Sequence, residues 1–198
     1  MKIVLFLVAI AVWIFVLRVL TRAKLPAWRF IWGAVGLFVI LMIFVLGYIT
    51  QPLAQGVTAI TGVIGQLTGT FDAFFKYGII YVPASDGSIT LQIDMECSGA
   101  IEILAFVCLL AFFRVYSPSE RVVVGLTGVV GIMFANALRV LIICEIVHFC
   151  GVGSYAVAHT YIGRLVFYGL TVLLYFYVFT RRQVKDMKVG EFEYGDRA

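Results

Sequence analysis

Cys97 is the residue whose type and setting most clearly suggest chemistry. It lies in Glu96-Cys97-Ser98-Gly99, where a polar segment with alternating hydrophobicity gives way to a long apolar run. A thiol is nucleophilic as the thiolate, which a nearby cation and the free amides at a helix start favour. Ser98 and Gly99 are expected to open a helix, placing its first-turn amides beside Cys97. Two structural alternatives remain, a small buried residue or a disulfide with Cys150.

Arg139 is the second candidate, because an arginine in an apolar helix is costly to keep charged near lipid. Placement at the bilayer centre costs at least ~2.5 kcal/mol, so we expect Arg139 to face the helix bundle or a polar cavity. Asn136 lies three residues earlier on the same helix face and can hydrogen-bond to the guanidinium or to a substrate carbonyl. The alternative is a structural arginine paired with Glu102 or Glu145.

His159, at the start of the last apolar segment, is the third candidate. Histidine exchanges a proton near neutral pH and can serve as a general acid or base. A merely solvated interfacial histidine is the alternative. His148 is a competing base, but it lies about 13 Å beyond Arg139 along a continuous helix. The three candidates together suggest a cysteine nucleophile with two helpers.

Composition shows which elements must position these residues. The chain has 198 residues, 63% of them hydrophobic, and a mean hydropathy of +1.05. This is too apolar for a soluble domain and indicates a polytopic membrane protein. Because a membrane span needs about 20 predominantly apolar residues, we expect five spans, at about residues 2–20, 30–50, 98–114, 120–147 and 160–180.

The distribution of basic residues predicts the orientation of the spans. Cytoplasmic segments next to spans carry an excess of lysine and arginine. Eleven of the 15 cations fall on what is then the cytoplasmic side, at Arg18, Arg22, Lys24, Arg29, Arg114, Arg121, Arg181, Arg182, Lys185, Lys188 and Arg197. The N-terminus and Cys97 are then outside, and residues 181–198 form a cytoplasmic tail. This pattern anchors a membrane protein and does not indicate nucleic-acid binding.

Residues 51–97 are expected to form an external segment. Residues 51–70 are glycine-rich and too polar for a span, which favours an interfacial or re-entrant helix. Alternation with a period of two over residues 89–96, after the run Tyr77 to Val82, predicts a β-hairpin. Ser117 and Glu120 form a capping-box pattern that starts the fourth span. The expected fold is a single all-α polytopic membrane domain over residues 1–198, with a small extracytoplasmic hairpin and an outer-surface helix.

No cofactor or metal is expected. The two histidines lack the close pairing with other donors that a zinc site requires, and the chain has no glycine-rich phosphate loop or dinucleotide motif.

Three motifs, in order, resemble those of the exosortase and archaeosortase family of integral-membrane cysteine transpeptidases. They are the acidic-Cys-small-Gly element at Glu96 to Gly99, the Asn-x-x-Arg element at Asn136 to Arg139, and His159 at the start of the last helix. The match covers about residues 90 to 180. Since many exosortases carry additional spans, this chain resembles a short branch, of the Gram-positive type.

The resemblance implies a protein-sorting protease in the plasma membrane of a prokaryote, with its active site facing outside. Its partners would be the lipid bilayer and secreted proteins that end in a sorting motif, a transmembrane segment and a basic tail. Cys97 would cleave this signal through a thioester that passes to an acceptor. Arg139 would stabilise the thiolate or oxyanion, and His159 would carry the proton. Supporting or substrate-binding roles would fall to Asn136, Glu96, Ser98 and Gly99.

The residues alone also allow two other functions. In a small transporter or structural assembly protein, Arg139, Glu102 and Glu145 would line a polar path or lock helices together. A thiol-disulfide enzyme would instead need both Cys97 and Cys150.

Overall fold

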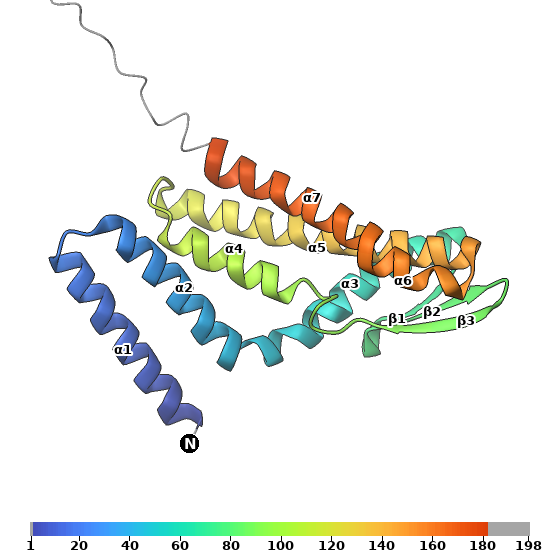
Figure 1. Ribbon diagram of the computed structural model, residues 1–198, viewed down its shortest axis with the longest axis horizontal. Helices are drawn as coiled ribbons and strands as arrows, with labels where there is room; N and C mark the ends of the chain where they lie inside the picture. Colours follow the sequence, from blue (N-terminus) through green and yellow to red (C-terminus); the bar gives the residue numbers. More distant parts are fainter. Residues whose placement is uncertain (1, 182–198) are drawn as a thin grey trace, which may run out of the picture.

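A single long helix, α5 (Pro118–Cys150), is the element on which the other elements pack. The computed structural model describes residues 2–181, and Figure 1 shows helices along one end of α5 and a small sheet beside the other. At 1.5 Å per residue, α5 is about 50 Å long, well beyond the ~30 Å thickness of a bilayer core. It can therefore cross the membrane and still extend beyond it. Ser117 caps its start, and the predicted capping box with Glu120 is confirmed.

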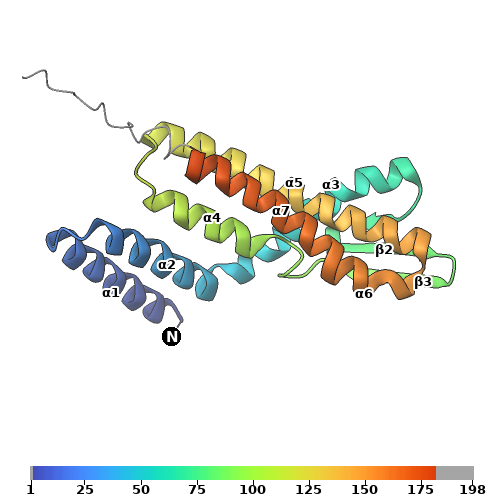
Figure 2. The same ribbon diagram turned by 45° about the horizontal axis from the view of Figure 1, so that its top comes forward.

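The first two helices are antiparallel and lie at the end of the molecule away from the sheet (Figures 1 and 2). They are α1 (Lys2–Arg22) and α2 (Pro26–Phe44), joined by a short turn in which Lys24 has a left-handed φ of 55°. The chain bends at Val45 and continues as α3 (Leu46–Thr68). The expected span over residues 30–50 is therefore wrong at its end, because residues 46–50 belong to α3. The helix expected at 51–70 does form, but its depth in the membrane stays a prediction.

The element before α5 is shorter than expected. α4 (Ala100–Phe112) has 13 residues, or about 20 Å, so the expected span at 98–114 is too long. Two backbone features limit it. Gly99 has a left-handed φ of 74° just before the first turn, and Phe113 is extended just after the last. Within residues 2–181, four helices are long and apolar enough to span a membrane, and α4 is a shorter apolar helix beside them.

The last helical stretch runs from Val152 to Thr180 without a break and changes its pitch along the way. Its parts are a 3-10 turn η2 (Val152–Ser154), α6 (Tyr155–Val157), a π-helical segment η3 (Ala158–Gly163), α7 (Arg164–Tyr175) and a second π segment η4 (Phe176–Thr180). The stretch begins earlier than the expected start at residue 160 and so includes His159 within its regular backbone. Arg181 ends the described part, and the tail beyond it, 182–198, lies outside the described residues.

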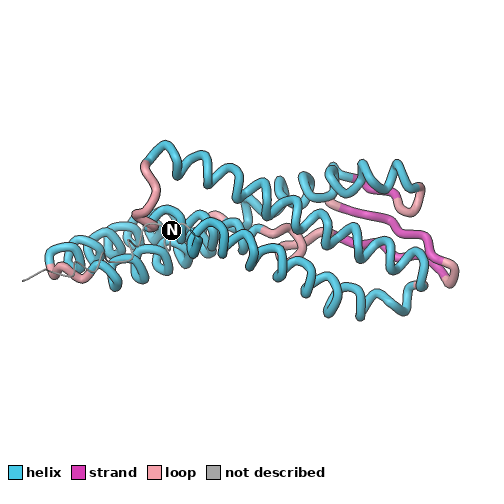
Figure 3. Tube along the Cα trace, turned by 90° about the horizontal axis from the view of Figure 1, so that it is seen from above, coloured by secondary structure: helices cyan, strands magenta, loops and turns pink. Residues whose placement is uncertain are grey.

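The sheet has three antiparallel strands in the order β1-β2-β3, where a two-stranded hairpin was expected. They are β1 (Asp72–Phe74), followed by a 3-10 turn η1 (Phe75–Tyr77), then β2 (Ile79–Ala84) and β3 (Gly87–Gln92). Ala84 pairs with Gly87, so the connecting loop has two residues. Figure 3 shows the strands lying among helices at one end of the molecule. The strand expected over 89–96 ends at Gln92, four residues before Glu96.

Two larger hydrophobic cores lie along α5, and a smaller cluster around Leu46, Ala100 and Leu104 joins α2, α3 and the start of α4. The core at the sheet end joins α3, the sheet and the last turns of α5, with Val57, Ile80 and Val147 fully buried. The other core joins α4, the first half of α5 and α7 around Phe106 and Phe167. The loop that leads into α4 lies where these two cores meet, and this loop carries Cys97.

Candidate active site

The loop that carries Cys97 is shaped by Asp94. One carboxylate oxygen, Asp94 Oδ1, accepts hydrogen bonds from the backbone amides of Glu96 at 3.0 Å and Cys97 at 3.1 Å. This is the local side-chain-to-backbone bonding by which aspartate stabilises turns. It ends the sheet segment and turns the chain towards α4. Ser98, fully buried, adds a bond from its Oγ to the Met95 carbonyl at 3.2 Å.

Two side chains of α5 hold the carbonyls of the same loop. Asn136 Nδ2 donates to the carbonyl of Cys97, and Arg139 Nη1 donates to that of Glu96 at 3.3 Å. Gly99 passes against Asn136 with its left-handed φ of 74°, a conformation that side chains rarely adopt. Of the two partners considered for Asn136, the guanidinium is not the one that its side chain contacts here, because Nδ2 donates to the loop carbonyl. The contribution of Glu96 is its main-chain carbonyl, since its side chain is exposed.

His159 completes the cluster from the last helix. Its Nε2 lies 3.3 Å from Cys97 Sγ and 3.5 Å from Arg139 Nη2. The ring of Tyr155, one turn earlier, stacks on the imidazole with centroids 5.4 Å apart and planes 27° apart. His159 itself lies in the π-helical segment η3. The structure thus brings Cys97, Arg139 and His159 together, and their catalytic roles stay a prediction.

These distances indicate which form of the imidazole suits the site. A guanidinium has only donors, so a bond from Arg139 requires a lone pair on Nε2. The Cys97 thiol can donate to the same lone pair. Both neighbours therefore favour a neutral His159, with its proton on Nδ1 and its lone pair on Nε2 as the acceptor. This is the form a general base needs.

The thiol is not poised as a thiolate, which corrects the expectation drawn from the helix start. Burial raises the pKa of Cys97 to about 11, and the nearby charge of Arg139 lowers it by less than burial raises it. The Asp94 carboxylate raises the pKa further. Cys97 therefore needs a base to become nucleophilic at neutral pH, and His159 Nε2 is in contact with it.

Exposed apolar side chains lie close to the cluster on both helices. On α5 they recur from Val122 to Leu138, and Phe149 is exposed again near the end of the helix. On the last helix they recur from Val157 to Tyr177, so His159 lies between Val157 and Tyr161. The depth of the cluster in the membrane therefore stays a prediction.

The alternatives considered for these residues have other partners in the structure. His148 Nδ1 lies 2.7 Å from the Pro83 carbonyl and fastens α5 to the sheet. Glu145 accepts a hydrogen bond from Thr70 at 2.8 Å. Neither Glu145 nor Glu102 forms an ion pair with Arg139 in the part of the chain the structure describes. Arg139 is only 4% exposed and lies 5.8 Å from the Phe167 ring centre.

The disulfide alternative is not what the structure shows. All four cysteines are free, with Cys150 exposed at the end of α5. Cys108 and Cys144 are both buried, Cys144 in the core at the sheet end. No group of three or more metal-ligating side chains that could hold a metal ion occurs among residues 2–181.

Three residues at the site were missed by sequence reasoning. Asp94 precedes Cys97 by three residues, a spacing typical of an aspartate that binds backbone amides in a turn. Tyr155 precedes His159 by four, the spacing of neighbours on a helix. Both signals were present in the sequence. Phe167 carried no comparable signal, because its contact with Arg139 depends on how α5 and α7 pack.

The fold and the cluster define a multi-pass integral membrane protein with a thiol, an imidazole and a guanidinium in contact. The family model described as transmembrane exosortase (Exosortase_EpsH) matches residues 1–177, and the chain belongs to this family. It therefore has a membrane exosortase-type function, the membrane-bound processing of secreted substrates that carry sorting signals. Searches of curated proteins and of solved structures found no match.

Proposed function

We propose that this protein is a cysteine transpeptidase that cleaves the C-terminal sorting signal of secreted proteins through a thioester on Cys97. The observation that carries the proposal is the contact of His159 Nε2 with both Cys97 Sγ and Arg139 Nη2, at 3.3 and 3.5 Å. A nucleophile in contact with a base, with a cation at the same point, is the arrangement that acyl transfer by a thiol requires.

In the first half of the reaction, Cys97 Sγ attacks the carbonyl carbon of the scissile peptide bond. The thiol proton moves to His159 Nε2 as the S–C bond forms, so the step does not need a pre-formed thiolate. The carbonyl oxygen becomes an oxyanion, which the Arg139 guanidinium stabilises as a donor of fixed geometry. Collapse of this intermediate breaks the C–N bond, and His159 returns its proton to the leaving amine.

In the second half, an acceptor nucleophile attacks the thioester. His159 removes the proton of this nucleophile, the new acyl bond forms, and the thiol is regenerated with that proton. Arg139 Nε and Asn136 Oδ1 are buried without hydrogen-bond partners in the described part of the chain. Both atoms therefore have unused capacity for a substrate group, Arg139 as donor and Asn136 as acceptor.

The proposed setting is the plasma membrane of a prokaryote, with the site facing outside and the C-terminal tail in the cytoplasm. It is supported by the excess of cations at the opposite ends of the helices. The proposed substrate is a secreted protein ending in a short motif, a transmembrane segment and a basic tail. An anchored substrate of this kind presents its scissile bond at the level of the bilayer edge, where we expect Cys97 to lie.

The test is the fate of such a substrate in cells that carry Cys97→Ala, with Cys150→Ala as the matched control. We expect the first variant to accumulate uncut substrate with its anchor and the control to process normally. Wild-type protein should also yield a thioester adduct that hydroxylamine releases. Normal processing by Cys97→Ala would overturn the proposal, and an equal block in both variants would favour a thiol-disulfide enzyme.

A further inference from the structure

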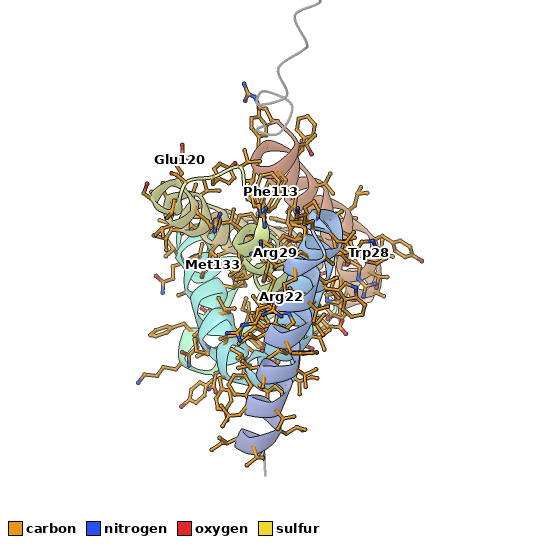
Figure 4. The ribbon with its side chains drawn as sticks, turned by 90° about the vertical axis from the view of Figure 1, so that its left-hand side faces the viewer. Arg22, Trp28, Arg29, Phe113, Glu120 and Met133 are labelled. Carbon is orange, nitrogen blue, oxygen red and sulfur yellow. The ribbon has the colours of Figure 1, made fainter. Side chains whose placement is uncertain are left out.

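The end of the molecule opposite the sheet contains a cavity with cationic walls. It lies between the start of α2 and the end of α4, has a volume of about 460 Å³, and is lined by Arg29, Arg114 and Arg121. A second hollow of about 280 Å³ shares Arg29 and Arg114 with it and adds Lys24. We call these two adjoining hollows the basic cavity. In Figure 4, which faces this end, Arg29 and Phe113 lie near its middle and Trp28 lies at its edge.

Among the residues that the structure describes, no carboxylate lines the basic cavity. Within residues 2–181, Lys24, Arg29 and Arg114 form no ion pair or side-chain hydrogen bond. Like charges gathered without a counterion repel one another, so an anion bound between them relieves an unfavourable arrangement. A role in membrane orientation alone requires basic residues near the membrane but does not require them to line one cavity.

The backbone adds to the attraction for an anion. α2 begins at Pro26, which lines both hollows, and its start has no side-chain cap and no acidic residue in the first turn. The free amides there carry the positive end of the helix dipole. Arg121 Nε is also buried without a hydrogen-bond partner among the described residues. These donors suit a group with several acceptor oxygens.

The remaining walls are apolar, which decides the kind of anion. Phe30, Phe112 and Phe113 line the larger hollow. Trp28 and Trp32, both exposed, belong to the first turns of α2, at the level where tryptophan prefers the membrane interface. A site that combines cationic and aromatic side chains in this way fits an anionic group attached to a hydrocarbon chain. Basic pockets between transmembrane helices are known to take anionic lipid headgroups.

We propose that the basic cavity binds the phosphodiester headgroup of an anionic phospholipid from the leaflet at this end. Arg29 and Arg114 bind the phosphate oxygens, and Lys24 adds a positive charge from the smaller hollow. The phenylalanines of the larger hollow contact the glycerol and the first acyl carbons. The inference does not depend on the proposed transpeptidase activity.

The test uses purified full-length protein in a neutral detergent, with dioleoyl phosphatidylglycerol as the probe. Native mass spectrometry counts bound lipid, and thermal unfolding measures the shift in Tm. We expect phosphatidylglycerol to bind and to raise Tm at concentrations where dioleoyl phosphatidylcholine does neither. The double variant Arg29→Gln/Arg114→Gln should weaken binding about tenfold or more, because each basic residue contributes substantially to attraction for anionic lipid.

The matched control is Arg18→Gln/Arg22→Gln, which removes two charges from the same end but none that lines the basic cavity. It should change the affinity less than about twofold, since it alters only the diffuse surface charge. Equal losses in both double variants would overturn the proposal, and so would equal binding of the two lipids. A Tm rise with inorganic phosphate as large as that with phosphatidylglycerol would assign the cavity to a free anion and overturn the lipid assignment. If the variant Arg29→Gln/Arg114→Gln does not fold, the comparison of the two lipids on the wild-type protein still decides whether the cavity prefers the anionic lipid.

Discussion

The two ends of α4 are each held by an arginine of α5, and the two arginines have different partners. At the end of α4, Arg121 donates to three main-chain carbonyls, those of Ala111, Phe113 and Tyr116, at 3.0 to 3.3 Å. Before its start, Arg139 donates to one carbonyl and to the imidazole of His159. Both guanidinium groups also have a buried Nε without a partner in the described residues. The two residues thus share a helix and this bonding pattern, although Arg139 is buried and Arg121 is only partly buried.

What distinguishes the two arginines is the chemistry of their partners. Main-chain carbonyls neither gain nor lose protons, so the bonds that Arg121 makes to them only fasten the loop between α4 and α5. His159 exchanges protons near neutral pH, so Arg139 acts on a group whose state changes. The comparison predicts that disturbing the Arg121 end should change stability, whereas disturbing the Arg139 end should change the rate.

The largest expected effect follows from removing the base. His159→Gln should lower substrate processing about 10²- to 10⁴-fold, because the buried thiol then has no group to take its proton. His148→Gln should leave processing nearly intact and lower stability by about 1 kcal/mol through its lost contact with Pro83. The measurement is the rate of anchor removal from a reporter substrate, with thermal unfolding alongside. Full activity in His159→Gln would break the assignment of the base.

The next effect compares the two arginines directly. Arg139→Lys should lower processing about 10²- to 10³-fold, because lysine keeps the charge but loses the planar donors for an oxyanion. Arg121→Lys should process substrate at close to the normal rate and show a lower Tm, since one ammonium cannot serve three carbonyls as well. Kinetics and unfolding measured on both variants check this. If the two substitutions change rate and Tm in the same way, the contrast between the two ends fails.

A smaller effect concerns the reactivity of the thiol with pH. With a pKa of about 11, Cys97 is mostly protonated at neutral pH. Its alkylation by iodoacetamide should therefore rise about tenfold per pH unit between pH 7.5 and 9.5 without a plateau. Arg139→Gln should slow alkylation at every pH, because the charge that lowers the pKa is gone, and Arg121→Gln should not. A variant with Cys97 as its only cysteine isolates the signal, and a plateau below pH 9 would show a pre-formed thiolate.

The smallest effect concerns the loop that presents the thiol. Asp94→Ala removes the acceptor for two backbone amides and should lower processing about 30-fold or less, as the lost bonds are each worth ~1 kcal/mol. Asp94→Asn removes the same charge, which raises the Cys97 pKa, but keeps an acceptor oxygen. It should therefore process faster than Asp94→Ala. The same reporter assay measures both, and the opposite order would show that the hydrogen bonds of Asp94 do not position Cys97.

Much of the membrane architecture was predictable, because long apolar helices and a basic end follow from composition and charge. The sequence also indicated the residues of the cluster, because an arginine in an apolar helix is costly without a partner and Cys97 precedes the expected start of a helix. The break at Val45 was missed because it falls within a continuous apolar run, and Gly47, two residues later, already lies inside α3. The early end of β3 was missed because the alternating pattern continues to Glu96, while Asp94 already turns the chain.

The site geometry depended on tertiary packing in a way that sequence could not give. The pairing of Asn136 with the Cys97 carbonyl, in place of Arg139, follows from how the loop crosses α5. The elevated pKa of the thiol follows from burial by elements far apart in sequence. The sequence shows which residue types occur and how far along each helix they lie. It does not show which hydrogen-bond partner each polar atom has in the folded protein.

The π-helical segment at His159 changes the direction in which side chains point around the axis of the last helix. A π turn holds one residue more than an α turn, and each residue of an α-helix advances the chain by about 100° around the axis. The residues of α6 and the first turn of η3 are therefore rotated relative to α7 by an amount that one residue sets. Deleting the exposed Tyr161 would restore α geometry and carry His159 and Tyr155 together away from Cys97, while Phe167 keeps its packing below. The chain length of a single turn thus determines whether the imidazole meets the thiol.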